Sequence, residues 1–433
     1  MKVDIAMEKA EKERIAVVGG GIAGLTAAYL LNGQYDITLF EKENRVGGNA
    51  YTHQTKNGEL MDIAVGAVAK APGAHSFLKL CKLVNAETVS QVRNGYISLH
   101  DLDTSSGLYV TPLSLSGLLA QKFRLYGSLT MPRTLIAVRR LSKMLDQGEL
   151  RALSMAEALN LIPGLKRLER FFIVGFLCTV TCLCYPDIMN GPAEYFVGKI
   201  KSFDLLNPLA LMLGNYFPRK FTRSYVNALA APFADKIVFN AEIQKILRND
   251  KKVTVRMQNG AELLFDRIVF ACNADQALAL IENPTEDERK LLGAWKYKDV
   301  LMVVHRDDTY APARPLCQPW TAIQSPRNGL PHFSISYCCW SLNPATSDKS
   351  EYFSTQHPNF PIKAELIDFQ KTFRVPLVDF DSYPTIEQLP RLNGCMRSYF
   401  CGSHFGFCLH GHAVNSAVNV ARLLGVDCRI LER

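Results

Sequence analysis

Four glycines near the start of the chain are spaced for contact with phosphate groups. They belong to the string Gly19, Gly20, Gly21, Ile22, Ala23, Gly24, in which the first, third and fourth glycines follow the pattern G-x-G-x-x-G. Gly19 permits a tight turn, Gly21 lets the backbone approach a pyrophosphate, and Gly24 lets a helix pack closely on a strand. A helix that begins here also offers free N–H groups and the positive end of its dipole. The string therefore predicts a dinucleotide-binding turn.

A carboxylate follows at the distance that such a site requires. Glu41 stands 17 residues after Gly24, at the end of a second apolar run, and Lys42 comes next. A carboxylate there can accept hydrogen bonds from both ribose hydroxyls of an adenosine, and it would repel the extra phosphate of NADP. The alternative is a structural turn followed by a solvated acid. Because the glycine turn and the carboxylate occur in one short segment, a binding site is favoured over a structural turn. We expect Glu41 and Lys42 to contact the ligand.

These residues need a strand, a turn, a helix and a second strand to position them. The apolar run at 14–19, the alanine-rich stretch at 24–33 and the run DITLFEK at 36–42 predict a parallel βαβ unit over 14–52. The run IVFA at 268–271 is typical of a strand covered on both faces, which could return to the same sheet. Residues 394–425 predict one more strand and a helix that ends at a glycine.

A second glycine pair identifies the ligand more closely. Gly47 and Gly48 follow Arg45 just past Glu41. Here the sequence resembles the amine-oxidase-like flavoprotein superfamily, which includes monoamine oxidases, protoporphyrinogen oxidase and carotenoid desaturases. Its members carry an R-x-G-G loop after the ribose-binding glutamate and then a short acidic-glycine segment. Residues 62–67 (DIAVGA) stand at that place, with Ala64 where the family has glycine. The resemblance implies that the cofactor is FAD.

The resemblance continues in the second half of the chain. Residues 265–292, LNP at 342–344, HPNF at 357–360 and residues 397–425 are similar to a subgroup of FAD-binding amine-oxidase-like proteins, which includes flavin domains fused to plant cyclopropane fatty acid synthases. It implies a backbone contact to adenine at Ile243, and it places Gly402 and Ser403 near the ribityl chain and flavin phosphate. The helix from Ala413 would aim its N-terminus at the flavin ring. The further cofactor contacts that it implies are Gly47, Gly48, Asn49, Gly66, Ala67 and Cys272.

The fold class expected from these features is α/β. A Rossmann-like FAD-binding domain of the glutathione-reductase-2 type is assembled from 14–84, 229–289 and 391–427. An α+β substrate domain is inserted in two pieces, 85–228 and 290–390. The first insertion has a mainly helical pattern and the second a mixed one. The dipeptide Asn259-Gly260 predicts a β-hairpin in the cofactor domain.

Two histidines are the candidate catalytic residues. The subgroup's usual G-Y-G-F-H-E-D-G is replaced here by GFCLHGHA at 406–413, so His410 is kept and the Glu-Asp pair becomes Gly411-His412. A histidine in the flavin pocket can exchange protons near neutral pH. The alternative for each is a structural role, as a helix cap or a partner of a backbone carbonyl. Lys298 lies near the position where amine oxidases often place a lysine.

Composition excludes some classes of protein. The formal charge of +8 is diffuse, and no block of basic residues interleaved with aromatics predicts nucleic acid binding. Twelve cysteines occur without a CxxC pair, so buried free thiols and no metal site are expected. The charged start lacks an apolar signal stretch, which indicates the cytoplasm, where thiols stay reduced. The apolar run at 171–185 is too short to span a bilayer and predicts a buried helix. Residues 106–145 mix apolar and basic side chains, which favours a solvated helix packed on one face and leaves peripheral membrane contact as the alternative.

The expected function is an FAD-dependent oxidoreductase. It would remove a hydride from a C–H bond of a hydrophobic, lipid-like or amine small molecule, and molecular oxygen or another acceptor would reoxidise the flavin. A flavin-dependent double-bond isomerase of an unsaturated fatty acid uses the same cofactor without net oxidation. A non-catalytic flavin-bound protein is the third possibility, because the Glu-Asp pair and the glycine at position 64 are both replaced.

Overall fold

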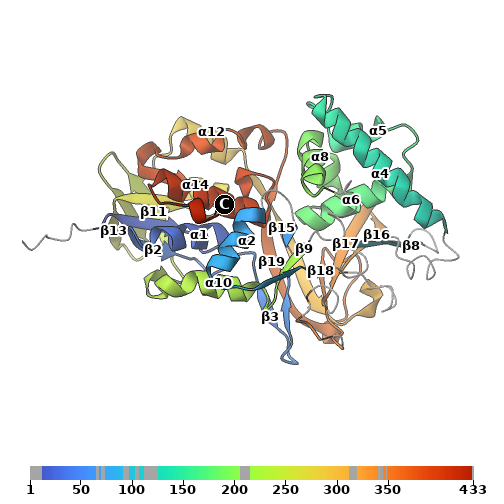
Figure 1. The fold of residues 1–433 in the computed structure, drawn as a ribbon, viewed down its shortest axis with the longest axis horizontal. Coiled ribbons are helices and arrows are strands. Elements are labelled where there is room, and N and C mark those ends of the chain that lie inside the picture. The colour runs from blue at the N-terminus through green and yellow to red at the C-terminus, as the bar shows by residue number, and fades with distance from the viewer. Residues whose placement is uncertain are drawn as a thin grey trace, which may run out of the picture.

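A five-stranded parallel sheet occupies one end of the molecule, at the left of Figure 1. The structure is a computed structural model that describes residues 12–64, 68–69, 74–90, 97–102, 107–111, 125–204, 215–311, 319–339, 343, 345–347 and 349–431. The sheet has the order β10-β2-β1-β14-β20, and all its strands are parallel. Its strands are β10 (Ile237–Val238), β2 (Asp36–Phe40), β1 (Arg14–Val18), β14 (Arg267–Phe270) and β20 (Ser398–Phe400).

The central strand β1 has an apolar layer on each face. Ile15 and Val17 pack with helices α1 (Ile22–Leu31) and α14 (His410–Leu423), whereas Ala16 and Val18 belong to a second core beneath the other face. Side chains alternate between the faces of a strand, so a strand covered on both faces is apolar throughout. The expected return of 268–271 to this sheet is confirmed, because β14 pairs with β1 from Ile15↔Arg267 to Val18↔Phe270.

A small antiparallel sheet covers the second face. It consists of β11 (Ile243–Arg248), β12 (Val253–Met257) and β13 (Glu262–Phe265). The hairpin predicted at Asn259-Gly260 is confirmed: it joins β12 to β13, and Gly260 adopts φ +85°. Helices α11 (Ala274–Leu280) and α12 (Glu286–Gly293) follow β14.

A seven-stranded sheet forms the middle and right of the molecule in Figure 1. Its order is β19-β15-β18-β17-β16-β7-β8, and of its pairings β16 with β7 is parallel while the others are antiparallel. The strands are β19 (Ile367–Leu377), β15 (Lys296–His305), β18 (Phe353–Gln356), β17 (Leu330–Cys338), β16 (Trp320–Arg327), β7 (Ile97–Asp101) and β8 (Gly107–Thr111). The segment 290–390 is therefore richer in strand than its mixed pattern suggested.

Five helices pack at the right of the molecule, beside this sheet. They are α4 (Leu125–Asp146), α5 (Met155–Asn160), α6 (Arg167–Thr181), α7 (Tyr185–Met189) and α8 (Ala193–Ser202). The helix predicted in the apolar run at 171–185 is present: α6 buries the residues from Phe171 to Cys178 except Phe176, and it ends where Cys182 adopts a left-handed conformation. None of the helices in the described part of the chain is both long enough and apolar enough to cross a membrane.

The remaining elements connect the two ends of the molecule. A hairpin of β3 (Thr52–Gln54) and β4 (Leu60–Asp62) lies near a small sheet of order β5-β9-β6, formed by Val68–Ala69, Asn215–Pro218 and Thr88–Ser90. Helix α2 (Ala74–Leu83) packs on α14, and α10 (Thr222–Ala230) packs on α1. Ten cysteines are free, as expected, and five of these are buried. The expectation of buried free thiols is wrong for Cys395, which is exposed, and for Cys338, which is disulfide-bonded.

A buried ion pair joins the small antiparallel sheet to α12. The Arg248 guanidinium donates to both carboxylate oxygens of Glu288, at 2.6 and 2.8 Å, and both side chains are buried. The positive charge of Arg248 holds the pKa of Glu288 below its usual value, against the opposing effect of burial. The pair thus fixes the position of α12 against β11.

We predict that Arg248→Leu lowers the free energy of unfolding by about 3–5 kcal/mol, because it leaves the Glu288 carboxylate buried without its ion-pair partner and with the backbone N–H of Thr285 as its remaining donor. Denaturant titration of the purified protein measures the change. The matched control is Arg256→Leu in the next strand, where the ion pair with Glu262 is exposed and its loss should cost less than about 1 kcal/mol. Equal effects of the two substitutions would contradict the role given to the buried pair.

Candidate cofactor and substrate site

The glycine turn after β1 has the geometry that a dinucleotide needs. Gly19 adopts φ +106° and its N–H donates to the carbonyl of Phe40 at 2.8 Å. A Cβ atom at Gly24 would lie 1.8 Å from the carbonyl oxygen of Gly19, so the helix can approach the strand only without a side chain. At Gly21 such an atom would meet nothing within 4 Å. The turn is closely packed at Gly19 and Gly24. It is open at Gly21, where a pyrophosphate would pass.

The N-terminus of α1 is free to bind an anion. The helix begins after Gly21 without a side-chain cap, and it has no acidic residue in its first turn. Its first N–H groups thus lack the carboxylate or hydroxyl that usually satisfies them. Ile22 and Ala23, the predicted contacts in this turn, are buried and hold the helix against the core. A phosphate at this end would complete the hydrogen bonding.

Glu41 lies directly beside the glycine turn. Its carboxylate is buried and accepts hydrogen bonds from the backbone N–H groups of Gly20 at 2.6 Å and Glu43 at 2.8 Å. A carboxylate has about four acceptor positions, so each oxygen retains capacity for a ribose hydroxyl. These backbone bonds were not expected from the sequence. They fix the orientation of the carboxylate before any ligand arrives.

The R-x-G-G loop packs on the glycine turn. The N–H of Gly47 donates to the carbonyl of Gly20 at 2.7 Å, and a Cβ atom at Gly48 would lie 3.2 Å from the Cα atom of Gly21. Both Gly47 and Gly48 have positive φ. The Arg45 guanidinium closes the loop by donating to the Gly48 carbonyl at 2.7 Å. The two glycine motifs, separate in sequence, thus form one surface.

Several other predicted cofactor contacts surround this surface. Cys272 follows β14, and its backbone nitrogen would lie 3.1 Å from a Cβ atom at Gly19. Ile243 begins β11, two residues after Ala241, whose N–H donates to the Glu41 carbonyl at 2.8 Å. Lys42 is exposed next to Glu41. Asn49 is also exposed, and its amide donates to the Arg374 carbonyl at 3.3 Å, so it points toward β19.

The end of β20 leads to a second helix N-terminus. The N–H of Gly402 donates to the hydroxyl of Ser416 at 2.9 Å, and this bond ties the turn after β20 to the first turns of α14. Ser403 lies in that turn, and Ala413 is buried one turn into the helix. Helix α14 has neither a side-chain cap nor an acidic residue in its first turn. It therefore presents a second free positive end near the same sheet edge.

The structure separates the two candidate histidines. His410 turns toward α2 and α10: its Nε2 atom lies 2.9 Å from the Tyr225 hydroxyl, and its ring packs edge-to-face on Phe77 at 5.0 Å. Burial lowers the pKa of His410 to about 4, so the ring is neutral. The hydrogen bond to Tyr225 is consistent with the alternative of a structural role for His410. The partner is the phenol of Tyr225 rather than a backbone carbonyl. His410 has a fixed partner.

His412 keeps a free nitrogen. Its Nδ1 atom is buried and has no hydrogen-bond partner within the described part of the chain, and its ring packs edge-to-face on Phe407 at 5.6 Å. Burial, followed by the charge of Lys199, lowers the pKa of His412 to about 4. A buried polar atom without a partner is unfavourable. Of the two histidines, His412 is the one with a buried ring nitrogen that has no partner among the described residues.

Two charged residues near the site, Asp62 and Lys199, were not predicted from the sequence to take part in it. Asp62 accepts hydrogen bonds from Thr52 and from the backbone and hydroxyl of Thr222, so it joins the hairpin β3–β4 to the start of α10. Burial raises its pKa to about 6. Lys199 is buried on α8. The sequence spacing could have indicated that Lys199 is buried, because it stands four residues after Tyr195 and three after Phe196, on the apolar face of a helix.

Some predicted residues have other positions or cannot be placed. Gly66 and Ala67 lie outside the described residues, as does part of the LNP segment. Lys298 forms an ion pair with Asp187 at 3.0 Å, with nearly half of its side chain exposed. The ring of His332 is hydrogen-bonded to the backbone carbonyl of His357 at 3.1 Å. Among the described residues no group of three potential metal ligands occurs.

The family comparison covers most of the chain. A family model described as flavin containing amine oxidoreductase matches residues 22–321. An L-amino-acid oxidase from Pseudechis australis is 24% identical over 287 residues, which are 61% of this chain and 51% of that protein. The curated relatives are matched over between 9% and 52% of their own length, so the chain spans about half of them or less.

Solved structures share the fold at low sequence identity. Putrescine oxidase bound to putrescine superposes with a TM-score of 0.68 at 14% identity, covering 96% of this chain and 99% of that one. A fatty acid isomerase from P. acnes that produces CLA gives 0.63 at 17% identity, covering 95% and 98%. Both similarities establish a mixed α/β fold shared with flavin amine oxidases and with this isomerase.

We predict that two glycine substitutions in the turn fail in different ways. Gly24→Ala forces a methyl group into the Gly19 carbonyl and should abolish soluble, folded protein. Gly21→Ala has room for its methyl group, so the protein should fold with unchanged stability but bind FAD at least about tenfold more weakly, because the methyl occupies the path of the pyrophosphate. Equilibrium dialysis against FAD and thermal unfolding measure the two effects.

Gly33→Ala is the matched control, because it lies just beyond the same helix and a Cβ atom there would meet nothing within 4 Å. It should keep both stability and FAD affinity. If Gly21→Ala binds FAD as tightly as this control, the pyrophosphate does not pass over the turn.

Proposed function

The chain belongs to the flavin-containing amine oxidoreductase family, and we propose that it removes a hydride from a C–H bond of a hydrophobic or amine small molecule. Its cofactor is FAD. The observation that carries the proposal is the meeting of two uncapped helix N-termini, those of α1 and α14, at the carboxyl edge of one parallel sheet. Ligands of open α/β sheets bind at this edge.

The cofactor would extend from the glycine turn to α14. In this arrangement the adenosine diphosphate half contacts the turn and Glu41, and the flavin half reaches the start of α14. The residues assigned to the first half are Gly19, Gly21, Ile22, Ala23, Gly24, Glu41, Lys42, Gly47, Gly48, Asn49, Ile243 and Cys272. Those assigned to the second half are Gly66, Ala67, Gly402, Ser403 and Ala413. The support is the geometry of the turn and the packing of the two loops described above.

The division into domains is part of the same proposal. A Rossmann-like FAD-binding domain would comprise 14–84, 229–289 and 391–427, and the substrate domain would be inserted as 85–228 and 290–390. The parallel sheet takes its five strands from the first set of segments, and all seven strands of the large sheet come from 85–228 or 290–390. A substrate would then approach the flavin from the side of the large sheet and of helices α6 and α8.

The chain's own residues would position the substrate and move a proton. When bound, FAD supplies the acceptor for two electrons and a hydride. The positive end of α14 favours the negative charge that accumulates on the flavin ring. His412 is neutral, and its free Nδ1 atom can accept a proton from a substrate heteroatom as the C–H bond breaks. His410 is bonded to Tyr225 and would act as a positioning residue for the start of the helix.

An isomerase is the second candidate. It would return the hydride to another carbon of the same substrate, so that a double bond moves without net oxidation. The observation in its favour is the shared fold with a CLA-producing fatty acid isomerase. A non-catalytic flavin-bound role remains the third candidate, supported by the loss of the Glu-Asp pair before α14.

We predict that the purified protein contains FAD and that a substrate bleaches its absorbance without oxygen. The test is anaerobic titration with a panel of amines, amino acids and unsaturated fatty acids, followed by mass spectrometry of the products. An oxidoreductase gives a product lighter by two hydrogens and consumes oxygen on reoxidation. An isomerase gives a product of unchanged mass. A protein that takes up no FAD would refute both proposals.

His412→Gln should lower the rate of flavin reduction by about 100-fold or more if His412 accepts the proton. His410→Gln is the control, because the structure gives His410 a partner away from this role. Equal losses in the two variants would contradict the assignment.

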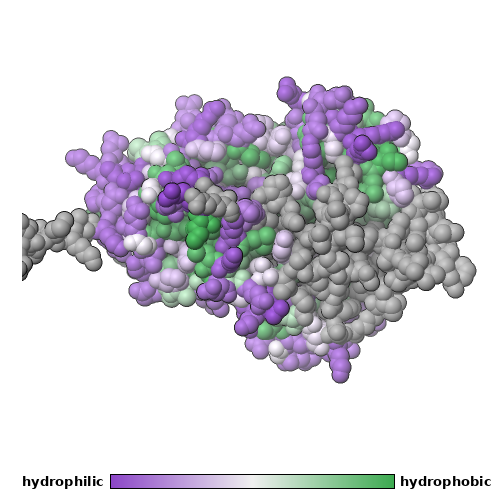
Figure 2. Space-filling model, in the orientation of Figure 1, coloured by the Kyte–Doolittle hydropathy of each residue, from purple (hydrophilic) through white to green (hydrophobic). Residues whose placement is uncertain are grey.

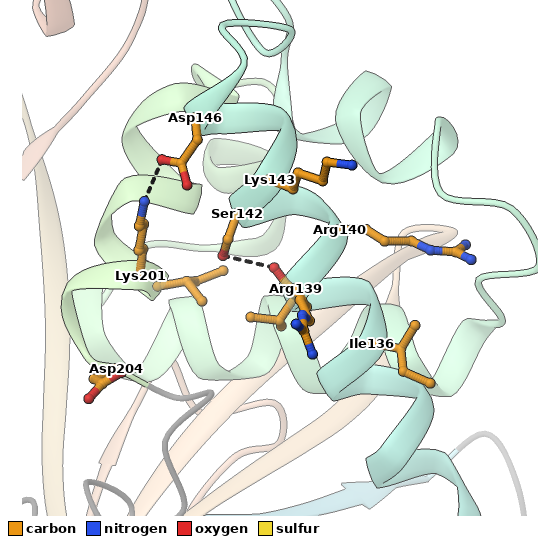
Figure 3. Close-up of a pocket in the computed structure, with 10 residues that line it drawn as sticks. Ile136, Arg139, Arg140, Ser142, Lys143, Asp146, Lys201 and Asp204 are labelled. Atoms are coloured by element: carbon orange, nitrogen blue, oxygen red, sulfur yellow. Dashed lines mark hydrogen bonds and ion pairs between the residues drawn. The ribbon is translucent and has the colours of Figure 1, made fainter.

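A membrane surface is a further proposed partner, and α4 supplies its support. Arg133, Ile136, Arg140 and Lys143 recur at helical spacing and form one exposed stripe, with Ile136 55% exposed. Figure 3 shows Arg140, Lys143 and Ile136 on one side of α4, and the ion pair of Lys201 with Asp146 on the other. Figure 2 shows hydrophilic and hydrophobic residues side by side on this part of the surface. Cations around an exposed aliphatic side chain fit an anionic bilayer.

We predict that the double variant Arg140→Glu, Lys143→Glu binds vesicles of phosphatidylcholine with phosphatidylserine at least about tenfold more weakly than the wild type, since each basic residue near such a surface contributes about 1 kcal/mol. Co-sedimentation measures the binding. The charge-matched control is Lys251→Glu, Arg391→Glu, at exposed positions outside the stripe. Equal losses in both double variants would show a general charge effect and refute the site.

A further inference from the structure

Helix α8 carries two lysines in opposite environments. Lys201 is exposed and forms an ion pair with Asp146 of α4. Lys199, two residues earlier, is 1% exposed. It lies on the apolar face of the helix with Tyr195 and Phe196. Because lysine is among the residues least often buried without a partner, its surroundings decide what it does.

No described carboxylate neutralises the Lys199 ammonium. Its Nζ atom lies 5.7 Å from the centre of the Tyr195 ring, and the groups that act on its charge are the thiols of Cys408 and Cys182. Burial raises the pKa of both thiols, that of Cys182 to about 11, so they are neutral near pH 7. Burial lowers the pKa of Lys199 to about 8, which leaves most of the side chain charged at that pH.

A buried ammonium without an anion is energetically costly. Desolvation of a charged group costs several kcal/mol even after relaxation, and an ion pair is the usual compensation. The aromatic face of Tyr195 offsets a part of this cost. A bound anion would compensate for the rest of the desolvation cost of the ammonium. The pairing that Lys201 has in the protein is thus missing at Lys199.

The same region contains a second group without a partner. The buried Nδ1 atom of His412 lacks a hydrogen bond, and the Lys199 charge acts on this imidazole. Phe407 connects the two: its ring lies 5.7 Å from that of Tyr195 and 5.6 Å from that of His412. A Cβ atom at Gly198 would lie 3.2 Å from the Phe407 ring, so the glycine lets α8 approach this loop closely.

The loop itself holds an unusual backbone conformation. Cys408, next to Phe407, adopts φ +53° although it is not a glycine. Its Sγ atom donates to the carbonyl of Gly406 at 3.9 Å, within the same loop. Non-glycine residues in this region of φ carry strain that is found preferentially at ligand sites. The strained loop, Lys199 and His412 converge at the start of α14, where the proposed function places the flavin half of FAD.

We propose that Lys199 binds the carboxylate of the substrate, so that this protein acts on an organic acid with an apolar body rather than on a simple amine. The inference rests on the proposed function and specifies its substrate class. Lys199 supplies the charged contact beside His412, and the rings of Tyr195 and Phe407 supply an apolar wall. A simple amine would bring a second positive charge beside the buried ammonium, which is unfavourable.

The test compares ligands that differ in one functional group. Octanoate, octanol and octylamine, and in parallel benzoate, benzyl alcohol and benzylamine, are titrated into the FAD-loaded protein by calorimetry and by the change in flavin absorbance. We expect at least one carboxylate to bind at least about tenfold more tightly than its matched alcohol, the usual effect of a charged hydrogen bond. Lys199→Met should remove this preference, and Lys199→Arg should keep most of it.

Three results would overturn the inference: tighter binding of the amines, an unchanged carboxylate preference in Lys199→Met, or no binding by any ligand of either series. Lys201→Met, on the same helix, is the control and should leave the preference intact. FAD content and thermal unfolding show that each variant is folded. A wild-type protein without FAD refutes the proposed function itself, whereas an FAD-loaded protein without carboxylate preference refutes only the role of Lys199.

Discussion

The closest backbone approach in the candidate cofactor site is that of α1 to the end of β1, and the rest of the site depends on it. At Gly24 there is room for hydrogen and nothing larger, because a Cβ atom would lie 1.8 Å from the Gly19 carbonyl oxygen. This approach sets the helix N-terminus at the carboxyl edge of the sheet. It also brings the Gly20 N–H to Glu41 and the Gly20 carbonyl to Gly47. One steric constraint therefore positions the phosphate site, the ribose carboxylate and the second glycine loop.

Local patterns were sufficient to predict the parallel sheet and its turn. The glycine spacing, the continuous apolar run at 268–271 and the Asn259-Gly260 dipeptide each act over a few residues, and the structure has the strand pairing and hairpin that they indicate. The seven-stranded sheet was not predicted. It pairs β7 with β16, more than 200 residues apart in sequence, and such long-range pairings leave no local signal. Its strands read as a mixed segment for that reason.

The site shows the same division between local and distant effects. The histidines before α14 could be found from the sequence, but their roles could not be separated, because Tyr225 and Phe77 come from helices far away in the chain. Asp62 reads as part of a motif, whereas the structure uses it to hold the start of α10. The position of Lys199 could have been recognised from its helical spacing with Tyr195 and Phe196. A lysine on the apolar face of a helix is either energetically unfavourable or positioned to bind a ligand.

The central claim is that one continuous FAD site runs from the turn at Gly21 to the N-terminus of α14. A crystal structure of the FAD-loaded protein tests it most directly. The account predicts pyrophosphate oxygens within hydrogen-bond distance of the first N–H groups of α1, ribose hydroxyls on Glu41 and the flavin ring next to the first turn of α14 near His412. Electron density for the pyrophosphate away from Gly21, or for the flavin ring away from α14, would contradict it.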